Sequence, residues 1–236
     1  MDNDFDISGL ARYLHISPEQ VLQLIHREGL PTRRVGGKQV FPRAEIHHWL
    51  EDRIGVSSEQ ELEKLEVVLE KNRMPECEHP ETLEEMLPSA SVKVPLRSRS
   101  PAKIIKEMVE LGGESGLLWD SGKMIEAVSA REKLHSTALD GGIALLHPRR
   151  PLPSILGDPF VALGRSYQGI PFGGSKGSLT DIFFLICSMN DAGHLKTLAR
   201  LSRLIGNKAF LGDLRQAETS EELHKVVIAA ETELIA

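Results

Sequence analysis

The sequence predicts an α/β fold for its larger C-terminal part, a mixed β-sheet flanked by helices, preceded by a small helical domain. Two observations carry this prediction. From Leu87 onward, short apolar runs alternate with amphipathic segments of helical length, a pattern typical of helices that cover a sheet. Before that point, residues 55–90 carry 3 Lys and Arg residues against 10 Asp and Glu residues. We therefore predict domains at 1–54 and 87–236, joined by an acidic helical linker at 55–86.

The composition is that of a globular protein without a strong excess of positive charge. Of the 236 residues, 41% are hydrophobic, and no stretch approaches the roughly 20 apolar residues of a membrane helix. The net charge is −1 over residues 1–54 and +2 over residues 91–236, so neither part has the charge of a strong nucleic-acid binder. The N-terminus lacks a signal-peptide pattern, and Cys77 and Cys187 cannot form a disulfide framework. We expect a cytoplasmic protein without membrane insertion.

The first 54 residues predict two short helices, a hairpin and a third helix. Asp6 is a candidate cap for a helix over residues 6–14, and Ser17 with Pro18 opens a second helix. The stretch "TRRVGGKQVF" predicts a hairpin with two glycines at its turn, and residues 43–53 predict the third helix. The apolar positions expected to face the core of this module are Ile7, Leu10, Ala11, Leu14, Val21, Leu24, Ile25, Ile46, Trp49 and Leu50.

The stretch "ISGLARYLHISPEQVLQLIHREGLPTRRVGGKQVFPRAEIHHWL" resembles the excisionase-like, MerR-related winged helix-turn-helix domain. The resemblance implies that residues 18–28 form the recognition helix, where Gln can read adenine and Arg can read guanine, with the hairpin near phosphates. The candidate DNA-binding residues are Gln20, Gln23, Arg27, Arg33, Arg34 and Lys38. Because the module is net negative, one copy should bind DNA weakly and in a salt-sensitive manner, and a homodimer would double the contacts. The module could equally serve as a protein-docking unit.

The acidic linker begins with a pattern typical of a helix and then loses it. One apolar stripe consists of Leu62, Leu65 and Val68 or Leu69, and it could pair with a second copy or pack on a domain. Pro75 and Pro80 interrupt the helical pattern. The "CEH" triplet starting at Cys77 offers too few ligands for a metal site, and we expect no metal or cofactor.

The C-terminal domain predicts four helices and four strands. The expected helices cover 101–113, 121–134, 192–205 and a last segment that opens on a capping box, Thr219 to Glu222. The expected strands are "SVKVPL", "GGIALL", "PFVALG" and "DIFFLICSM". Together they predict a sheet with helices on its faces.

Two stretches of this domain, "AREKLHSTALDGGIALLHPRR" and "DIFFLICSMNDAGHLKTLARLSRLIGNKAFLGDLRQAETSEELHKVV", resemble a known family. This is the enzyme IIA domain of the fructose/mannitol type, from the bacterial sugar phosphotransferase system, with the closest likeness to its nitrogen-regulatory branch. The resemblance covers roughly residues 87–235. It implies that His147, which follows the apolar run from Ile143 to Leu146, accepts a phosphoryl group from the phosphocarrier HPr and forms a phosphohistidine intermediate.

The chemistry of this position suits that role. A neutral imidazole is nucleophilic near pH 7. A strand end would fix the ring of His147, and an exposed tip would let a donor protein reach it. Phosphoryl transfer depends mainly on positioning and charge stabilisation, which nearby cations supply.

Further residues are expected to assist His147. Arg131 matches the helix arginine of the family, and His194 matches its second histidine. His194 lies in the first turn of a helix, where the positive helix end favours an anion and disfavours a protonated ring. Thr137 and Arg149 are candidate phosphate-binding residues. Arg149 and its neighbour also fit a solvated turn.

The sequence departs from the family around the phosphoacceptor. Ala138 and Asp140 replace two glycines, Leu146 replaces a proline, and Pro148 follows the histidine. A residue other than glycine is strained where the backbone needs a positive φ. These changes leave His147 intact and bear on the rate of transfer.

Three functions are compatible with these patterns. The first is a regulatory phosphocarrier of the phosphotransferase system, coupled by its helix-turn-helix module to DNA or to a protein. The second is a DNA-binding transcriptional regulator whose IIA-like domain is a non-catalytic sensor or dimerisation module. The third is an adaptor in which both domains have lost their ancestral chemistry.

Overall fold

The N-terminal module has the predicted order of two helices, a hairpin and a helix. The computed structural model describes residues 4–14, 16–54, 60–63, 82–174 and 177–235. The module consists of α1 (Ile7–Leu14), α2 (Pro18–Glu28), β1 (Arg33–Val35), β2 (Lys38–Val40) and α3 (Arg43–Ile54). β1 and β2 pair in antiparallel fashion, with Arg34 opposite Gln39. The predicted helix-turn-helix architecture with a small wing is therefore confirmed.

Local signals in the sequence explain these boundaries. The Ser17 hydroxyl accepts a hydrogen bond from the backbone N–H of Gln20, and the Gln20 side chain accepts one from the N–H of Ser17, which closes a capping box at the start of α2. Gly29 ends the helix with φ 64°. Gly36 and Gly37 turn the hairpin with φ 57° and 80°, a region that glycine adopts without steric cost.

The C-terminal domain alternates short strands with longer helices. Its elements are α5 (Leu83–Met86), β3 (Val92–Lys93), α6 (Pro101–Gly113), α7 (Ser121–Leu134), β4 (Ala138–Leu139), β5 (Ile143–Leu146), β6 (Phe160–Ile170), β7 (Thr180–Cys187), α8 (Asp191–Gly206), α9 (Lys208–Gln216) and α10 (Ser220–Ile235), with two 3-10 turns, η1 (Ser89–Ser91) and η2 (Pro153–Ile155). The capping box at the start of α10 is present, because Thr219 and Glu222 exchange side chain to backbone hydrogen bonds.

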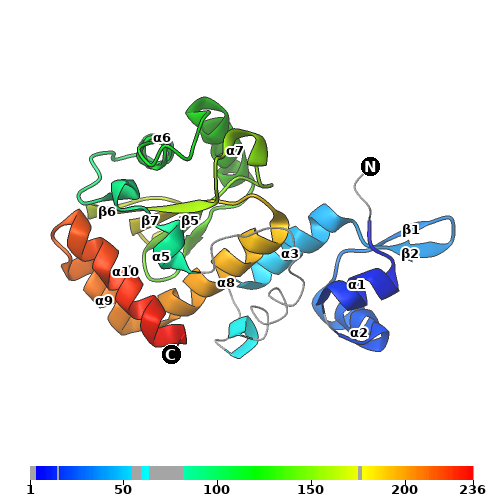
Figure 1. Ribbon diagram of the computed structural model, residues 1–236. Helices are drawn as coiled ribbons and strands as arrows, with labels where there is room; N and C mark the ends of the chain where they lie inside the picture. Colours follow the sequence, from blue (N-terminus) through cyan, green and yellow to red (C-terminus); the bar gives the residue numbers. More distant parts are fainter. Residues whose placement is uncertain (1–3, 15, 55–59, 64–81, 175–176, 236) are drawn as a thin grey trace.

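The five strands form one mixed sheet in the order β3-β6-β7-β5-β4. β5 runs parallel to β7, with Leu146 opposite Leu185, while β6 and β7 are antiparallel. In Figure 1, α6 and α7 cover one face of the sheet, and α8, α9 and α10 lie over the other. The predicted fold class, a mixed sheet flanked by helices, is confirmed.

Strand β5, which lies between β7 and β4, is buried on both faces, and this explains its unbroken apolar run. Ala144 and Leu146 pack in the layer of α6 and α7. Ile143 and Leu145 pack in the opposite layer, with α8, α9 and α10. All four residues are at most 4% exposed. This packing holds the end of β5, and the residue that follows it, in one position.

The beginning of the C-terminal domain is fastened to its last helix by a buried carboxylate. Glu231 on α10 accepts hydrogen bonds from the backbone N–H groups of Leu83 and Glu84, and Arg200 of α8 lies 3.1 Å from the same carboxylate. The carboxylate thereby satisfies free N–H groups at the start of α5.

Only a short part of the acidic linker belongs to the described residues. Residues 60–63 are helical, and Leu62 is buried. The other linker positions singled out in the sequence lie outside the described residues; they are Leu65, Val68, Leu69, Pro75, Cys77 and Pro80. Among the helices that the structure describes, none is long and apolar enough to cross a membrane.

Candidate functional site

His147 follows directly on β5 and is held by a hydrogen bond to its own strand. Its Nδ1 atom lies 2.7 Å from the carbonyl oxygen of Leu145. Because a carbonyl only accepts, Nδ1 carries the proton and donates it, which leaves Nε2 with a free lone pair. The structure therefore gives His147 one defined tautomer, with Nε2 as the reactive atom.

His194 lies beside His147, in the first turn of α8. Asn190 caps this helix by accepting a hydrogen bond from the N–H of Gly193 at 2.8 Å. The centroids of the two imidazole rings are 4.9 Å apart, and Ser188 Oγ lies 3.3 Å from His194 Nδ1. Burial lowers the pKa of His194, outweighing the opposite effect of a nearby carboxylate. The expected neutral ring thus owes more to burial than to the helix end.

Arg131, the third residue predicted to act in the transfer, is buried on α7. It stands in the last turn of α7, is 5% exposed, and donates from Nη1 to the carbonyl oxygen of His135 at 3.0 Å. Thr137 is also buried, but its hydroxyl donates to Glu132 at 2.6 Å. Arg149 is exposed, in the turn beyond His147. Thr137 and Arg149 therefore remain predictions as phosphate ligands.

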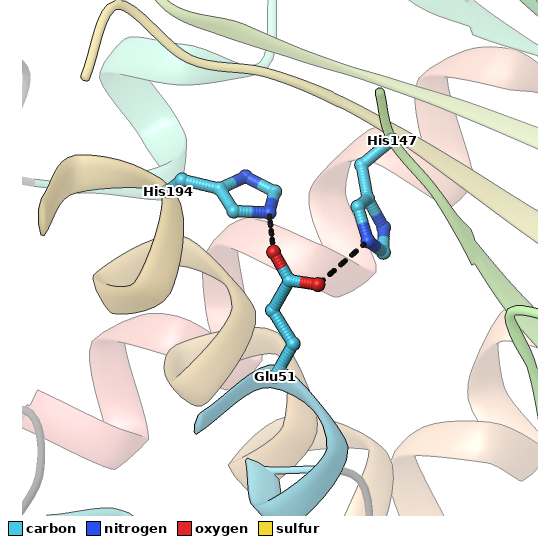
Figure 2. Close-up of side chains that lie close together, drawn as sticks. All are labelled: Glu51, His147 and His194. Atoms are coloured by element: carbon cyan, nitrogen blue, oxygen red, sulfur yellow. Dashed lines mark ion pairs between the residues drawn. The ribbon is translucent and has the colours of Figure 1, made fainter. Parts of the chain in front are cut away.

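A residue that the sequence analysis missed occupies the centre of this site. Glu51, on α3 of the N-terminal module, extends its carboxylate between the two histidines (Figure 2). Its Oε1 lies 3.5 Å from His194 Nε2, and its Oε2 lies 3.7 Å from His147 Nε2 and 3.9 Å from Arg131 Nη2. Only 6% of the Glu51 side chain is exposed. The expectation that His147 is an exposed tip is wrong, since α3 covers it and leaves 4% of its surface accessible.

The Glu51 carboxyl is ionised in this setting. Burial alone raises its pKa, but the His147 and His194 imidazoles outweigh burial and hold the pKa well below its usual range. Among the residues that the structure describes, none lies within hydrogen-bond distance of the buried Oε2 of Glu51 or of the Nε2 atoms of the two histidines with suitable geometry. All three groups thus face one another across a polar gap slightly wider than a hydrogen bond.

Further contacts anchor α3 on the first turn of α8. His47 Nδ1 lies 3.0 Å from Asp191 Oδ2, and Arg43 Nε lies 3.8 Å from the same oxygen. The Tyr13 hydroxyl is 3.0 Å from the other ring nitrogen of His47. Arg43, His47 and Glu51 follow one another at intervals of four residues, so they share one face of α3. This polar stripe is visible in the sequence, but its spacing is equally typical of a solvated helix face.

The replacement of a glycine by Ala138 does not strain the backbone before β5. The positive φ angles fall on Gly141 and Gly142, at 91° and 82°. Ala138 lies in β4, where the backbone is extended. The chain thus keeps glycine where the turn requires it.

The candidate DNA-binding residues lie away from this site, on α2 and the hairpin. Gln23, Arg27, Arg34 and Lys38 are exposed. Gln20 is exposed too, but its side chain closes the capping box of α2, and Arg33 pairs with Asp4. The face of α2 is therefore open while α3 contacts the C-terminal domain.

Three side chains of the site could also ligate a metal ion. Each of the three residues offers one ligand atom, and these atoms all lie within 4.8 Å of one another; the residues are Glu51, His147 and His194. Imidazole and carboxylate are ligands of zinc and other transition metals. The guanidinium of Arg131 beside the same carboxylate is a cation, and it favours an anion in this place over a metal ion.

The fold and site define a class of protein: an α/β domain that presents a strand-end histidine, a second histidine and an arginine together, joined to a helix-turn-helix module. Residues 85–230 match the family described as phosphoenolpyruvate-dependent sugar phosphotransferase system, EIIA 2, and the chain belongs to this family. Residues 5–54 match a helix-turn-helix domain family.

Similar proteins include sugar-transport and regulatory members. The chain is 29% identical over 145 residues to the PTS system fructose-specific EIIABC component of Bacillus subtilis, covering 61% of this chain but 22% of that protein. It is 28% identical over 146 residues to a nitrogen regulatory protein of Bradyrhizobium diazoefficiens, covering 61% and 89%. The crystal structure of the nitrogen regulatory protein IIA-Ntr from Neisseria meningitidis superposes with a TM-score of 0.55 and 24% identity, covering 61% of this chain and 98% of that chain.

Proposed function

We propose that this protein is a regulatory phosphocarrier that accepts a phosphoryl group on His147 from an HPr-type protein. The observation that carries the proposal is the hydrogen bond between His147 Nδ1 and the Leu145 carbonyl oxygen, 2.7 Å long. It presents the Nε2 lone pair to a site that also holds His194 and Arg131. The family membership of residues 85–230 and the likeness to nitrogen regulatory proteins support a regulatory role.

The chemistry of the step needs only groups that this site and the donor supply. The Nε2 lone pair of His147 attacks the phosphorus atom, a nitrogen–phosphorus bond forms, and the bond from phosphorus to the donor breaks. The Nδ1 proton stays on the ring, shared with the Leu145 carbonyl oxygen. Arg131 offsets the charge that spreads over the phosphoryl oxygens, and a neutral His194 donates one hydrogen bond to them.

Transfer of label from radioactive phosphoenolpyruvate through enzyme I and HPr tests this proposal. We expect acid-labile label on the wild-type chain and none on the His147→Ala variant. His26→Ala is the matched control, because His26 is exposed on α2. An acid-labile phosphate that remains on folded His147→Ala would refute the assignment.

A second function, DNA binding by the N-terminal module, is favoured by the exposure of α2 and the hairpin. Arg34 and Lys38 are exposed there, and Arg33 is near them on β1. We propose that they contact phosphates and that Gln23 and Arg27 face base edges. Binding is weak for one copy, since phosphate contacts supply most of the affinity.

Mobility-shift assays over a range of salt concentrations test this second function. Neutralising Arg33, Arg34 and Lys38 together should flatten the slope of log affinity against log salt by about one unit for each lost contact. Tight DNA binding by the triple variant would contradict the proposed phosphate contacts. If the wild-type chain does not bind DNA at all, the N-terminal module is better described as a protein-docking unit.

A further inference from the structure

We propose that the N-terminal module is a built-in ligand of the phosphoacceptor site, in which the Glu51 carboxylate takes the place of the phosphoryl group. Docking of α3 and phosphorylation of His147 then exclude each other. This inference rests on the proposed function of His147, and it adds that the chain regulates access to its own phosphoacceptor.

The Glu51 carboxylate lies where a phosphoryl group on His147 would lie. Glu51 Oε2 lies 3.7 Å from the reactive Nε2 of His147, and Oε1 lies 3.5 Å from Nε2 of His194. A phosphoryl group attached to His147 would extend from that same Nε2 atom into the space that the carboxylate fills (Figure 2). The two anions cannot share this space, because their charges repel each other and their atoms overlap.

The groups around the Glu51 carboxylate come from both domains. His147, His194 and Arg131 come from three elements of the C-terminal domain, and His48 Nδ1 approaches Oε2 from α3 itself at 3.5 Å. Arg131 is a cation, and the His194 and His48 rings can each turn an N–H toward the carboxylate; such groups recognise an oxyanion. Arg131 Nη2, 3.9 Å from Oε2, would face a metal ion with like charge.

The contacts beside Glu51 show that the module is held in a defined position. His47 and Arg43 both reach Asp191, three residues before His194 on α8. Figure 1 shows α3 lying along α8. The same face of α3 thus contacts the first turn of α8 through Arg43 and His47. One turn further along α3, it places the Glu51 carboxylate between the two histidines.

Coupling between the two events follows from their shared site. A ligand that binds only the undocked form shifts the equilibrium towards that form, and the coupling is reciprocal. Phosphorylated His147 therefore releases the helix-turn-helix module, and docking slows phosphorylation. The ligand of the unphosphorylated site is therefore an acidic side chain on a helix of the same chain, Glu51 of α3.

The test compares the initial rate of His147 phosphorylation by phosphorylated HPr in the full chain and in four variants. Glu51→Ala and Asp191→Asn should accelerate it, and if the docked form holds about 90% of the molecules the gain is about tenfold. Glu51→Gln, which keeps the shape and loses the charge, should also accelerate it. Glu45→Ala is the matched control, because Glu45 is an exposed carboxylate on the same helix, and it should react like the wild-type chain.

Hydrogen exchange gives a second readout that does not depend on phosphorylation. Backbone amides of α3 and of the first turn of α8 should exchange faster in unphosphorylated Glu51→Ala than in the wild-type chain. The same segments should exchange faster in the wild-type chain once it is phosphorylated. Unchanged exchange in Glu51→Ala would overturn the docking contact.

The outcomes separate this inference from the proposed function. Equal phosphorylation rates in wild-type and Glu51→Ala chains would overturn the inference and leave the phosphocarrier function standing. Faster exchange in Glu51→Ala without phosphorylation of any variant would refute the phosphocarrier function, and with it competition for the phosphoryl position. If Glu51→Ala but not Glu51→Gln accelerated phosphorylation, Glu51 would block the site by its size alone. That result would overturn the inference that its charge replaces that of the phosphoryl group. If a metal chelator alone brought the wild-type chain to the Glu51→Ala rate, a bridging metal ion would replace the direct contact and overturn the inference.

Discussion

His47 Nδ1 lies 3.0 Å from Asp191 Oδ2, and this contact joins the last helix of the N-terminal module to the first turn of α8. His47 is 7% exposed, and its other ring nitrogen lies 3.0 Å from the Tyr13 hydroxyl. One imidazole therefore connects α1, α3 and α8. Burial raises the pKa of Asp191, but His47 and Arg43 outweigh burial and lower it.

Replacing this imidazole should loosen the contact between the domains. In His47→Ala, the Tyr13 hydroxyl and the Asp191 carboxylate each lose a partner, and such losses typically cost about 1–3 kcal/mol. We expect a lower unfolding midpoint in urea for the N-terminal module and faster hydrogen exchange in α3. His26→Ala, an exposed histidine on α2, should leave both unchanged. Equal effects of the two substitutions would show that the His47 contact contributes nothing.

Acid should destabilise the folded protein, because the docking site contains two groups whose pKa values are lowered by folding. The groups that face Glu51 are His48 on α3, Arg131 on α7, His147 after β5 and His194 on α8.

The sign of the effect is the same for both groups. His194, with its pKa lowered from 6.5, stays neutral in the folded protein while the unfolded chain takes up a proton, so stability falls once the pH drops below that value. Glu51, with its pKa lowered from 4.5, contributes stability that is present above that pH and lost below it.

Thermal unfolding measured as a function of pH tests this expectation. The midpoint should fall progressively as the pH decreases from about 7 to about 3. His194→Gln should flatten the upper part of this dependence, and Glu51→Gln should flatten the lower part. A wild-type midpoint that is constant or rises on acidification would contradict the assigned charge states.

Much of the fold could be predicted because local signals mark its elements. Ser17 and Pro18 open α2, and the helix over residues 121–134 has the predicted bounds. The strand expected in "SVKVPL" is only two residues long, because Pro95 lacks the N–H that would continue the ladder; pairing resumes at Leu96, which donates to the Arg165 carbonyl oxygen. α9 was not predicted, although Asn207 caps it by accepting from the N–H of Ala209.

The candidate site was predictable only in part, for a physical reason. Three of the site residues, His147, His194 and Arg131, belong to one domain. The family resemblance therefore predicts that they lie together. The approach of Glu51 depends on how two domains pack, which no local periodicity specifies. Along α3, the apolar stripe of Ile46, Leu50 and Ile54 faces a core, while the parallel polar stripe that meets α8 resembles an ordinary solvated face.

Gly142 should be essential for the position of β5. Its φ is +82°, and an added Cβ would lie 2.8 Å from Arg215 Nη2, 3.0 Å from Asp181 Oδ1 and 3.1 Å from the Leu179 carbonyl oxygen. Arg215 and Asp181 form a two-bond ion pair there, with both N···O distances 2.7 Å. Gly142→Ala must strain the backbone and disturb this pair, at a cost of about 1–3 kcal/mol or more.

Urea unfolding measures that cost. Gly212→Ala is the control, because no atom of the described residues lies within 4 Å of its added Cβ and alanine favours the helix by up to about 1 kcal/mol. We expect a lower free energy of unfolding for Gly142→Ala and an equal or higher one for Gly212→Ala. Equal stability of the two variants would show that the β4–β5 turn accepts a side chain.

His194 should assist the phosphoryl transfer without accepting the group. Its Nε2 faces the same gap as Nε2 of His147, with the ring centroids 4.9 Å apart, and its pKa is lowered by burial, so the neutral ring has one hydrogen to donate. His194→Ala should still carry acid-labile label on His147. It should gain and pass on the phosphoryl group several-fold more slowly, since the loss of one positioning hydrogen bond costs about 1 kcal/mol. Because the substitution also removes a neighbour of Glu51 and would loosen docking, the rate is best measured in the Glu51→Ala background, where the site is open. A double variant that transfers as fast as Glu51→Ala alone would assign His194 to the docking contact and remove it from the transfer step.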